Sequence, residues 1–449
     1  MSEERSFRIG PIRPPSEAAS LLLQVTQGCT WNKCKFCNIY RDTKFKAYSA
    51  ESIRRDIDNI AYWAQRVQKH RLDPAGRAME NRPMGDPSTG DHTMEDGYSY
   101  LSGCPRWDIA GINAELQSMT DEDDRQSYYT VANWLLAGGE NVFLQDGNST
   151  VLSSGRLSDV LLYLRQTFPQ IRRITSYGRA ENLARLDAKA FAELKAAGLD
   201  RIHSGYETGS DEVLKRINKG LTQEQQITAG RAVKAGGIEL SIYFMPGIGG
   251  KELSEDNAVQ TAAVINAVDP DFLRIRTAAI KPGTEMYGIF FPERAGEAGL
   301  ETGPDAAGPH TLCSDDDKVR EIRKVIELAE GISTRIVSDH MVNLLQDVKG
   351  LMCSPNGAGS KGAAGQTGAG QTGVDPCKAA LFAQIDRYLN LPETDRRIFQ
   401  LLRRSLRAYD LDDMEILLQD GVYSLREEVM RYTDREWDEK MNDYISRYI

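Results

Sequence analysis

The sequence is short of cysteine and histidine, with 7 and 5 of them in 449 residues. Seven cysteines in so long a chain are too sparse for a disulfide scaffold, which excludes the small disulfide-rich secreted domains. No apolar run reaches the length of about 18 residues that suggests a membrane span. The polar opening Met1–Arg5 also has no apolar signal region. These absences predict a soluble, reduced, cytoplasmic protein with no membrane partner.

Positive charge is also in deficit. Lys and Arg number 55 against 65 Asp and Glu, which gives a formal net charge of −10. A broad electrostatic footprint for nucleic acid is therefore missing, and we do not expect a nucleic-acid partner. Hydrophobic residues make up 41% of the chain, which is enough for a sizeable core.

Three of the few cysteines stand together near the start of the chain. Cys29, Cys34 and Cys37 follow an apolar, strand-like run at Leu21–Val25, and Gly28 lies at the entrance of their loop. Three thiolates on one short loop suit a [4Fe–4S] cluster whose fourth iron is open to an outside ligand. An open metal position binds a substrate or cofactor, whereas a closed site mostly stabilises a fold. The loop therefore indicates chemistry.

A structural zinc site is the alternative, because clustered cysteines in a cytosolic chain often bind zinc. Such a site needs a fourth ligand, and no further cysteine or histidine lies near the loop. The histidines are all distant in sequence: His70, His92, His203, His310 and His340.

Short apolar runs alternate with amphipathic helices from about residue 140 to 282. This spacing implies βαβ units and a parallel sheet. Helix boundaries are marked by Asp187 and Gly198, and by a capping-box pattern at Thr222–Gln225. We predict an α/β fold, a partial (β/α)6 TIM-like barrel with a helical C-terminal extension, and these six strands: Leu21–Gln27, Asn141–Gln145, Arg172–Tyr177, Arg201–Tyr206, Leu240–Met245 and Phe272–Thr277.

Composition divides the chain further. Residues 70–124 are too long for an ordinary connection and read as a lid or a disordered insertion. A Gly/Ala/Gln/Ser tract reads as a flexible linker. The predicted organisation is an N-terminal segment 1–19, the barrel 20–290 with its insertion 70–124, a helical extension 291–353, the linker 354–376 and a C-terminal helical region 377–449.

Functional residues of such barrels gather at the carboxyl ends of the strands. The cysteine loop leaves the first predicted strand at such an end. Polar or Gly-rich segments follow the next strands at the same end, so we expect all of them on one rim: Asp146–Asn148, Ser176–Arg179, Glu207–Ser210 and Pro246–Gly250.

The cysteine loop and the six-strand series, together with GYETGSDEVLKRINKG at 205–220 and Pro282–Thr284, resemble the radical S-adenosylmethionine (SAM) superfamily. The resemblance covers roughly residues 18–290. It is greatest to the branch that holds the oxygen-independent coproporphyrinogen oxidase, Elongator-type and methylthiotransferase enzymes. The commonest cysteine spacing there is Cys-x3-Cys-x2-Cys, whereas four residues separate Cys29 from Cys34 here.

The resemblance implies a [4Fe–4S] cluster on Cys29, Cys34 and Cys37, with SAM bound at its open iron. One electron then cleaves SAM into methionine and a 5′-deoxyadenosyl radical, which abstracts hydrogen from a small or medium-sized metabolite. An electron donor such as flavodoxin or ferredoxin and sensitivity to oxygen are implied as well. Two alternatives remain: a non-catalytic cluster- or haem-binding chaperone of the same fold, and a zinc-stabilised interaction protein.

The resemblance also places SAM contacts at the start of the barrel. Phe36 matches the aromatic residue that packs near the adenine; an ordinary core aromatic is the alternative. The family's second-strand segment, often Gly-Gly-Glu, touches the methionine amino group. The literal Gly138–Glu140 precedes its strand, so Asp146, Gly147 and Asn148 take that role.

Further contacts follow strands three to five. Ser176 and Arg179 lie after the third strand, and the Arg179 guanidinium could pair with the SAM carboxylate. Glu207 could accept hydrogen bonds from ribose hydroxyls or the amino group. Gly247 and Ile248 would let the backbone approach the adenine. A solvated arginine and a simple tight turn are the alternatives at Arg179 and at Gly247.

The substrate residues are predicted from the last strand and two tyrosines. Arg276 and Arg274 alternate with apolar residues, and arginine inside a barrel calls for an anionic partner, either a substrate or a structural carboxylate. Tyr40 and Tyr206 could donate or relay hydrogen, or be buried structural tyrosines. Four remaining cysteines match no known auxiliary-cluster spacing: Cys104, Cys313, Cys353 and Cys377.

Overall fold

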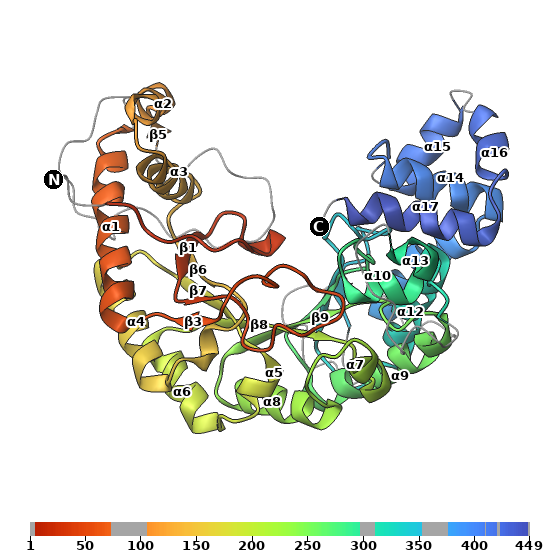
Figure 1. The fold of residues 1–449 in the computed structure, drawn as a ribbon, viewed down its shortest axis with the longest axis horizontal. Helices are drawn as coiled ribbons and strands as arrows, with labels where there is room; N and C mark the ends of the chain where they lie inside the picture. The colour runs from red at the N-terminus through yellow and green to blue at the C-terminus, as the bar shows by residue number, and fades with distance from the viewer. Residues whose placement is uncertain are drawn as a thin grey trace.

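The computed structural model describes residues 5–72, 106–296, 310–352, 376–408, 410–419 and 423–447 (Figure 1). Its centre is an eight-stranded sheet in the order β1-β6-β7-β8-β9-β10-β11-β12. The first six strands are the six predicted ones, and each pairs in parallel with its neighbour: β1 (Leu21–Gln24), β6 (Asn141–Gln145), β7 (Arg173–Tyr177), β8 (Arg201–Glu207), β9 (Glu239–Phe244) and β10 (Phe272–Ile275). The α/β partial barrel is therefore confirmed.

Two further strands extend this sheet where only helix was expected. β11 (Arg335–Val337) pairs in parallel with β10, and β12 (Gly350–Leu351) runs antiparallel to β11. Of the predicted helical extension 291–353, α12 (Asp315–Leu328) is the long helix. The strands escaped the sequence pattern because they are short and only Ile336 is a buried apolar residue in β11.

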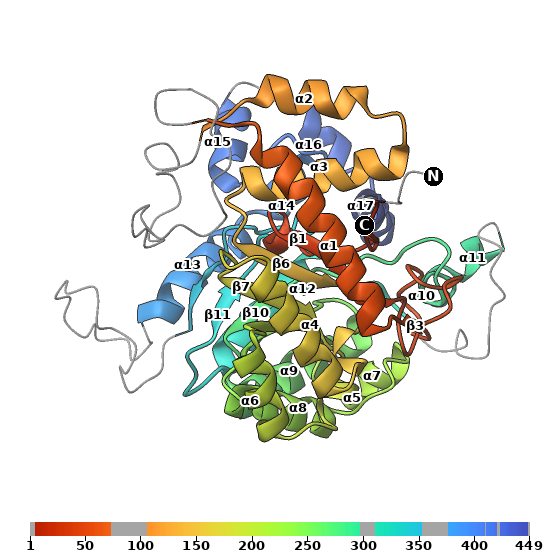
Figure 2. The ribbon, with the colours of Figure 1, turned by 90° about the vertical axis from the view of Figure 1, so that its left-hand side faces the viewer.

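Helices cover the outer face of the curved sheet, as Figures 1 and 2 show. This layer consists of α1 (Ala50–Gln68), α3 (Glu122–Leu136), α4 (Ser154–Thr167), α6 (Ala188–Ala197), α8 (Gln223–Ala235), α9 (Ser254–Val268) and α12. Alternate strand residues such as Leu23, Leu144, Ile202 and Leu240 are fully buried against these helices. Because successive side chains of a strand point to opposite faces, the other residues line the inner face of the barrel.

Local sequence signals set several helix ends as predicted. Asp187 caps α6, accepting a hydrogen bond from the Ala190 amide, and Gly198 ends it with φ of 113°. Thr222 and Gln225 form the predicted capping box of α8.

Part of the predicted insertion belongs to the outer layer. β4 (Arg71–Leu72) pairs with β5 (Arg106–Trp107), and α2 (Ile109–Ser118) leads to α3. Tyr128 of α3 packs edge-on against Trp63 of α1, with 6.0 Å between ring centroids. Residues 73–105, the centre of the predicted lid, and nearly all of the predicted linker 354–376 lie outside the described residues.

The C-terminal region is helical, as expected, and lies at the far end of the molecule from α1–α3 (Figure 1). It comprises α13 (Pro376–Leu389), α14 (Glu393–Arg404), α15 (Leu411–Gln419), α16 (Tyr423–Val429) and α17 (Asp434–Ser446). Asn442 of α17 bonds to both the amide and the carbonyl of Ile280, each at 2.9 Å. The helices are thus attached to the segment that follows β10.

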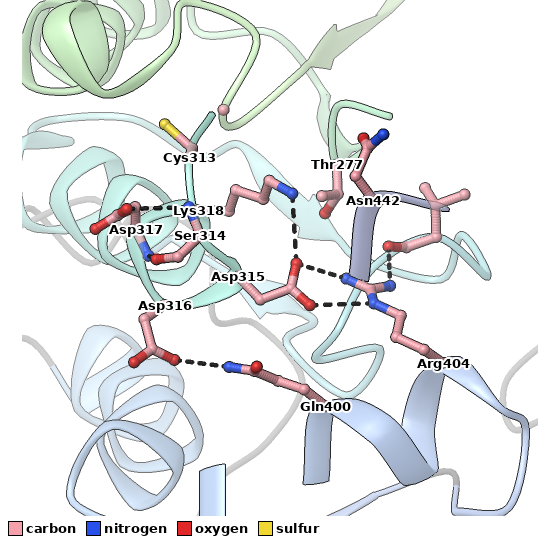
Figure 3. Close-up of polar contacts among 12 residues, drawn as sticks. Thr277, Cys313, Ser314, Asp315, Asp316, Asp317, Lys318, Gln400, Arg404 and Asn442 are labelled. Atoms are coloured by element: carbon pink, nitrogen blue, oxygen red, sulfur yellow. Dashed lines mark hydrogen bonds and ion pairs between the residues drawn. The ribbon is translucent and has the colours of Figure 1, made fainter. Parts of the chain in front are cut away.

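A buried charge network joins this helical region to α12 (Figure 3). Both carboxylate oxygens of Asp315 accept from the Arg404 guanidinium, at 2.9 and 3.1 Å, and Lys318 pairs with the same carboxylate at 3.4 Å. Asp316 accepts from Gln400 at 3.0 Å. None of the helices among the described residues has the length and apolar character needed to cross a membrane.

Candidate metal and cofactor site

The cysteine loop is fastened at several points to other elements of the barrel rim. β2 (Thr26–Gln27) and β3 (Lys46–Ala47) pair antiparallel and close the loop at its base. Within the loop, the Lys35 amide donates to the Ile217 carbonyl at 2.9 Å, and the Lys35 carbonyl accepts from the Met286 amide at 3.0 Å. The Trp31 indole donates to the Asn218 carbonyl at 2.7 Å. The loop therefore lies across the rim from β1 to the segments that follow β8 and β10.

The three loop cysteines are all free thiols. Burial raises the pKa of Cys34, the positive charges of Lys219 and Arg179 oppose that rise, and the neighbouring Cys29 and Cys37 add to it. The loop thiols are thus close enough to interact and face two cations. Thiolate ligands on a cluster carry negative charge, so this donor set with its nearby cations fits a [4Fe–4S] cluster.

A single metal ion is a different case. Within the described part of the chain, no three Cys, His, Asp or Glu side chains converge as they would around one ion. Three ligands of a [4Fe–4S] cluster bind three different irons, so they stand further apart than the ligands of one zinc ion.

Asp146, predicted as a SAM contact, lies directly behind the cysteine loop. Its Oδ2 accepts from the Gln24 side chain at 2.7 Å and from the Gly28 amide at 3.0 Å, and its Oδ1 accepts from the Tyr40 hydroxyl at 2.9 Å. Burial and the Asp146 carboxylate raise the pKa of Tyr40, so its hydroxyl keeps its proton. Asp146 and Tyr40 therefore hold the loop in place from within the protein.

Gly147 and Asn148 bring the end of β6 against the same loop. A Cβ atom on Gly147 would lie 3.1 Å from the Gly28 carbonyl oxygen and 3.2 Å from the Cys29 Cβ. The Asn148 side chain donates to Thr30 Oγ1 at 3.3 Å and accepts from the Arg179 amide at 3.3 Å. The loop can approach this closely only because residue 147 has no side chain.

Arg179 and Glu207 meet around a buried lysine that sequence reasoning did not single out. Lys219 donates to Glu207 Oε1 at 2.7 Å, and its carbonyl accepts from Arg179 at 2.9 Å. The Lys219 ammonium also lies 5.6 Å from the centroid of the Phe36 ring. Glu207 has a φ of 64°, which directs its side chain toward this group. Ser176, also buried, donates to the Tyr177 carbonyl at 3.0 Å.

The loop after β9 is held by a second residue that the sequence did not reveal, Glu321 of α12. Its Oε2 accepts from the Gly247 amide at 2.9 Å and from Asn257 at 2.7 Å, and its Oε1 accepts from Ser254 at 2.7 Å. Burial raises the pKa of Glu321 to about 7, although these donors oppose the rise. Ile248 is fully buried in an apolar cluster against which Phe36 packs.

The remaining predicted substrate residues lie apart. Tyr206 is buried on the outer side of the sheet and donates to the Gln226 carbonyl of α8 at 2.7 Å, so the structure does not bring it to the rim. Arg276 follows β10 and faces the inside of the barrel, where its charge acts on Tyr177, Tyr243 and His340.

Of these two residues that the sequence analysis did not single out, Lys219 and Glu321, only Lys219 could have been found from the sequence. It stands in the motif at 205–220 that carries the family resemblance, although no spacing rule relates it to Glu207. Glu321 offers no such signal, because it is one of several charged residues on an amphipathic helix.

The other cysteines do not form a second site among the residues that the structure describes. Cys313 is a buried free thiol 3.7 Å from Glu321 Oε1. Cys377 is disulfide-bonded, which removes it as a thiolate ligand. Cys104 and Cys353 lie outside the described residues.

Known proteins resemble parts of this chain. Residues 131–262 match the family model of the Radical SAM superfamily. The chain is 28% identical over 116 residues to the tRNA uridine(34) acetyltransferase of Methanocaldococcus jannaschii, covering 24% of this chain and 21% of that protein. It is 22% identical over 152 residues to the heme chaperone HemW of Bacillus subtilis, covering 33% and 39%. The chain spans well under two thirds of either relative's length.

Among solved structures, the chain is similar to the cobalamin-dependent S-adenosylmethionine radical enzyme OxsB. The TM-score is 0.38 with 15% sequence identity, covering 95% of this chain and 52% of that one.

The family match runs from α3 into α9 and includes β6. The cysteine loop lies outside the matched range and follows β1, the strand that pairs with β6. Residues 131–262 therefore carry a radical SAM domain, and the cofactors of that superfamily are a [4Fe–4S] cluster and SAM.

Proposed function

We propose that the protein is a radical SAM enzyme acting on a small or medium-sized metabolite. The observation that carries this proposal is the group of three free thiols on the β1 loop, held by Asp146 and faced by Lys219 and Arg179. A bound cluster would supply the one-electron reduction of SAM that gives methionine and a 5′-deoxyadenosyl radical, the species that would abstract hydrogen from the substrate. An external donor such as flavodoxin or ferredoxin provides that electron.

Cys29, Cys34 and Cys37 would hold the cluster, and neighbouring residues would bind SAM. Arg179 is 7% exposed, and its Nε has no hydrogen-bond partner among the described residues. A guanidinium with a free donor matches a carboxylate, so Arg179 is suited to the methionine end of SAM. Glu207 sits beside it and can accept from hydroxyl or amino groups.

The apolar cluster beside the loop excludes water from the adenine side. It contains Met245, Ile248, Ile280 and Met286, with Phe36 packed against it. A reactive carbon radical needs such a dry enclosure, because stray hydrogen donors would quench it. Gly247 and Ile248 provide backbone groups there without an intervening side chain.

The test is electron paramagnetic resonance of anaerobically purified, iron-reconstituted and reduced protein, with and without SAM. We expect a [4Fe–4S]⁺ signal that changes shape when SAM is added, together with formation of 5′-deoxyadenosine on chromatography. Cys34→Ala should lose the signal and the product. Cys313→Ala, which removes a buried thiol that contacts Glu321 rather than the cysteine loop, should keep the [4Fe–4S]⁺ signal. A cluster that is indifferent to SAM would overturn the proposal.

A second candidate, a non-catalytic haem chaperone, is favoured by the similarity to HemW. It predicts that the reconstituted protein binds haem stoichiometrically, seen as a Soret shift, and forms no 5′-deoxyadenosine. Product formation without haem binding would reject it.

A further inference from the structure

The inner face of the barrel carries two arginines, of which one has side-chain partners and the other has none among the described residues. Arg274 donates to Ser241 Oγ at 2.9 Å and pairs with Asp339 at 3.8 Å. Arg276 is held only by its backbone, whose amide donates to the Phe244 carbonyl at 2.9 Å. Its Nε is buried, and neither a hydrogen bond nor an ion pair is found for its guanidinium among the residues that the structure describes. One cation inside the barrel is therefore unmatched.

The groups around Arg276 are aromatic or hydrogen-bond donors. Rings of Tyr177 and Tyr243 flank His203 below, with centroid distances of 6.0 and 5.9 Å. His340 accepts from the Val342 amide at its Nδ1, which leaves the hydrogen on Nε2. Burial and the Arg276 charge lower the pKa of His340 to about 4. Among the described residues, two carboxylates face this group: Asp339, which pairs with Arg274, and Glu17, which lies 3.4 Å from His203.

Arg276 is half-buried, and its buried Nε is costly because that donor has lost water without gaining an acceptor. An anion bound at Arg276 would supply the missing acceptor. Arginine suits this role because its planar donors match the oxygens of a carboxylate or a phosphate. Two tyrosine hydroxyls and a neutral imidazole nearby can donate further hydrogen bonds to the same anion.

We propose that Arg276, with Tyr177, Tyr243 and His340, binds an anionic group of the substrate, a carboxylate or a phosphate. Naming this anion as part of the substrate rests on the proposed function, whereas anion binding itself does not. The substrate would enter with its charge against Arg276 and its reacting carbon toward the cysteine loop. Arg276 is thus a specificity residue.

The test uses protein without cluster or SAM, so that it is independent of turnover. Histidine side chains are labelled with ¹³C, and the pKa of His340 is measured by NMR in the presence of inorganic phosphate, of acetate, or of neither. An anion that neutralises Arg276 should raise the pKa of His340 by about 1 unit, since a nearby positive charge depresses it. If phosphate raises the pKa of His340 more than acetate does, the substrate group is a phosphate. If acetate raises it more, the group is a carboxylate.

Variants decide whether Arg276 is responsible. Arg276→Gln should raise the pKa of His340 by itself and abolish its dependence on both anions. Arg335→Gln, which alters an exposed arginine on neighbouring β11, should retain the dependence. Arg276→Lys keeps the charge and should retain weakened binding, which guards against a folding defect in the Gln variant. An unchanged His340 pKa with both anions in the wild-type protein would overturn the proposal.

Discussion

At the scale of single residues, the site depends on the residues that hold the cysteine loop in place as much as on the cysteines themselves. Asp146 directs both oxygens into the cysteine loop, and its φ of 76° is unusual for a residue other than glycine. Such left-handed residues cost free energy and persist where the surrounding structure fixes them. Here three hydrogen bonds fix Asp146, so the strained backbone at residue 146 helps to hold the cysteine loop in one conformation.

Substitution of Gly147 tests the close approach of β6 to the loop. Gly147→Ala would place a methyl group 3.2 Å from the Cys29 Cβ, so we expect destabilisation of about 1–3 kcal/mol and reduced iron content after reconstitution. Chemical denaturation and iron analysis provide the measurements. Gly155→Ala in α4, which meets no atom within 4 Å, should be stabilising by about 0.5–1 kcal/mol. Equal effects of the two substitutions would contradict the close packing.

Glu321 predicts a pH dependence of stability. Its pKa is raised from 4.5 to about 7 by burial, so the folded protein holds a proton that the unfolded chain releases. This stabilisation is complete below about pH 4.5 and is lost as pH rises through about 7. Wild-type protein should lose about 2.5 kcal/mol more than Glu321→Gln between about pH 5 and about pH 8.

Urea denaturation at both pH values measures this difference. The raised pKa of Asp438, to about 7, is common to both proteins and cancels in the comparison. Parallel pH profiles of wild type and variant would show that Glu321 is ionised in the folded state.

At the scale of elements, α12 connects three parts of the molecule. Its Glu321 holds the β9–α9 loop, and its Asp315 pairs with Arg404 of α14. Lys318 lies between them, packed where a Cβ on Gly247 would meet it at 2.8 Å (Figure 3). The helical region is therefore coupled to the loop proposed to approach the adenine.

Breaking the buried network should be costly. Asp315→Asn leaves Arg404 and Lys318 without their carboxylate, and we expect a loss of about 3–5 kcal/mol in unfolding free energy. The Asp315 and Arg404 side chains are 1% and 2% exposed, so solvent cannot compensate. Urea denaturation followed by circular dichroism measures the loss. Glu427→Gln, in an exposed pair with Arg431, should cost below about 0.5 kcal/mol, and a similar cost at Asp315 would refute the argument.

At the scale of the whole molecule, the N-terminal segment ties the outer helices to the inside of the barrel. The Arg5 and Ser6 carbonyls accept from Trp63 and Asn59 of α1, at 2.8 and 2.7 Å. Further on, Gln145 at the end of β6 donates to the carbonyls of Gly10 and Ile12. The segment ends at buried Glu17, 3.4 Å from His203.

Removal of residues 1–12 should therefore lower stability although the sheet and its helices remain. Several buried donors lose their acceptors, at about 1 kcal/mol each, so we expect a total of about 3–5 kcal/mol. Differential scanning calorimetry measures the shift in Tm. Removal of residues 2–4 alone keeps every contact named above and serves as the control. An unchanged Tm for the longer deletion would show that the segment contributes nothing.

Features that depend on neighbours along the chain could be predicted from the sequence. Alternating apolar runs predicted the six strands, and capping residues predicted the ends of α6 and α8. The cysteine spacing predicted the cluster ligands Cys29, Cys34 and Cys37, and this assignment stays a prediction. Each of these is set by the local backbone and by short-range hydrogen bonds. β11 and β12 were missed because they are stabilised by pairing with β10 rather than by their own composition.

The direction in which each rim residue faces depends on contacts between distant parts of the chain. An irregularity in β8 between Gly205 and Glu207 shifts the register, so Tyr206 packs beneath α8 while Glu207 reaches Lys219. Asp146 was predicted as a SAM contact, yet its oxygens meet partners more than a hundred residues away in sequence. Simple alternation along a strand cannot anticipate a bulge or a distant partner, because both arise only when the sheet is assembled.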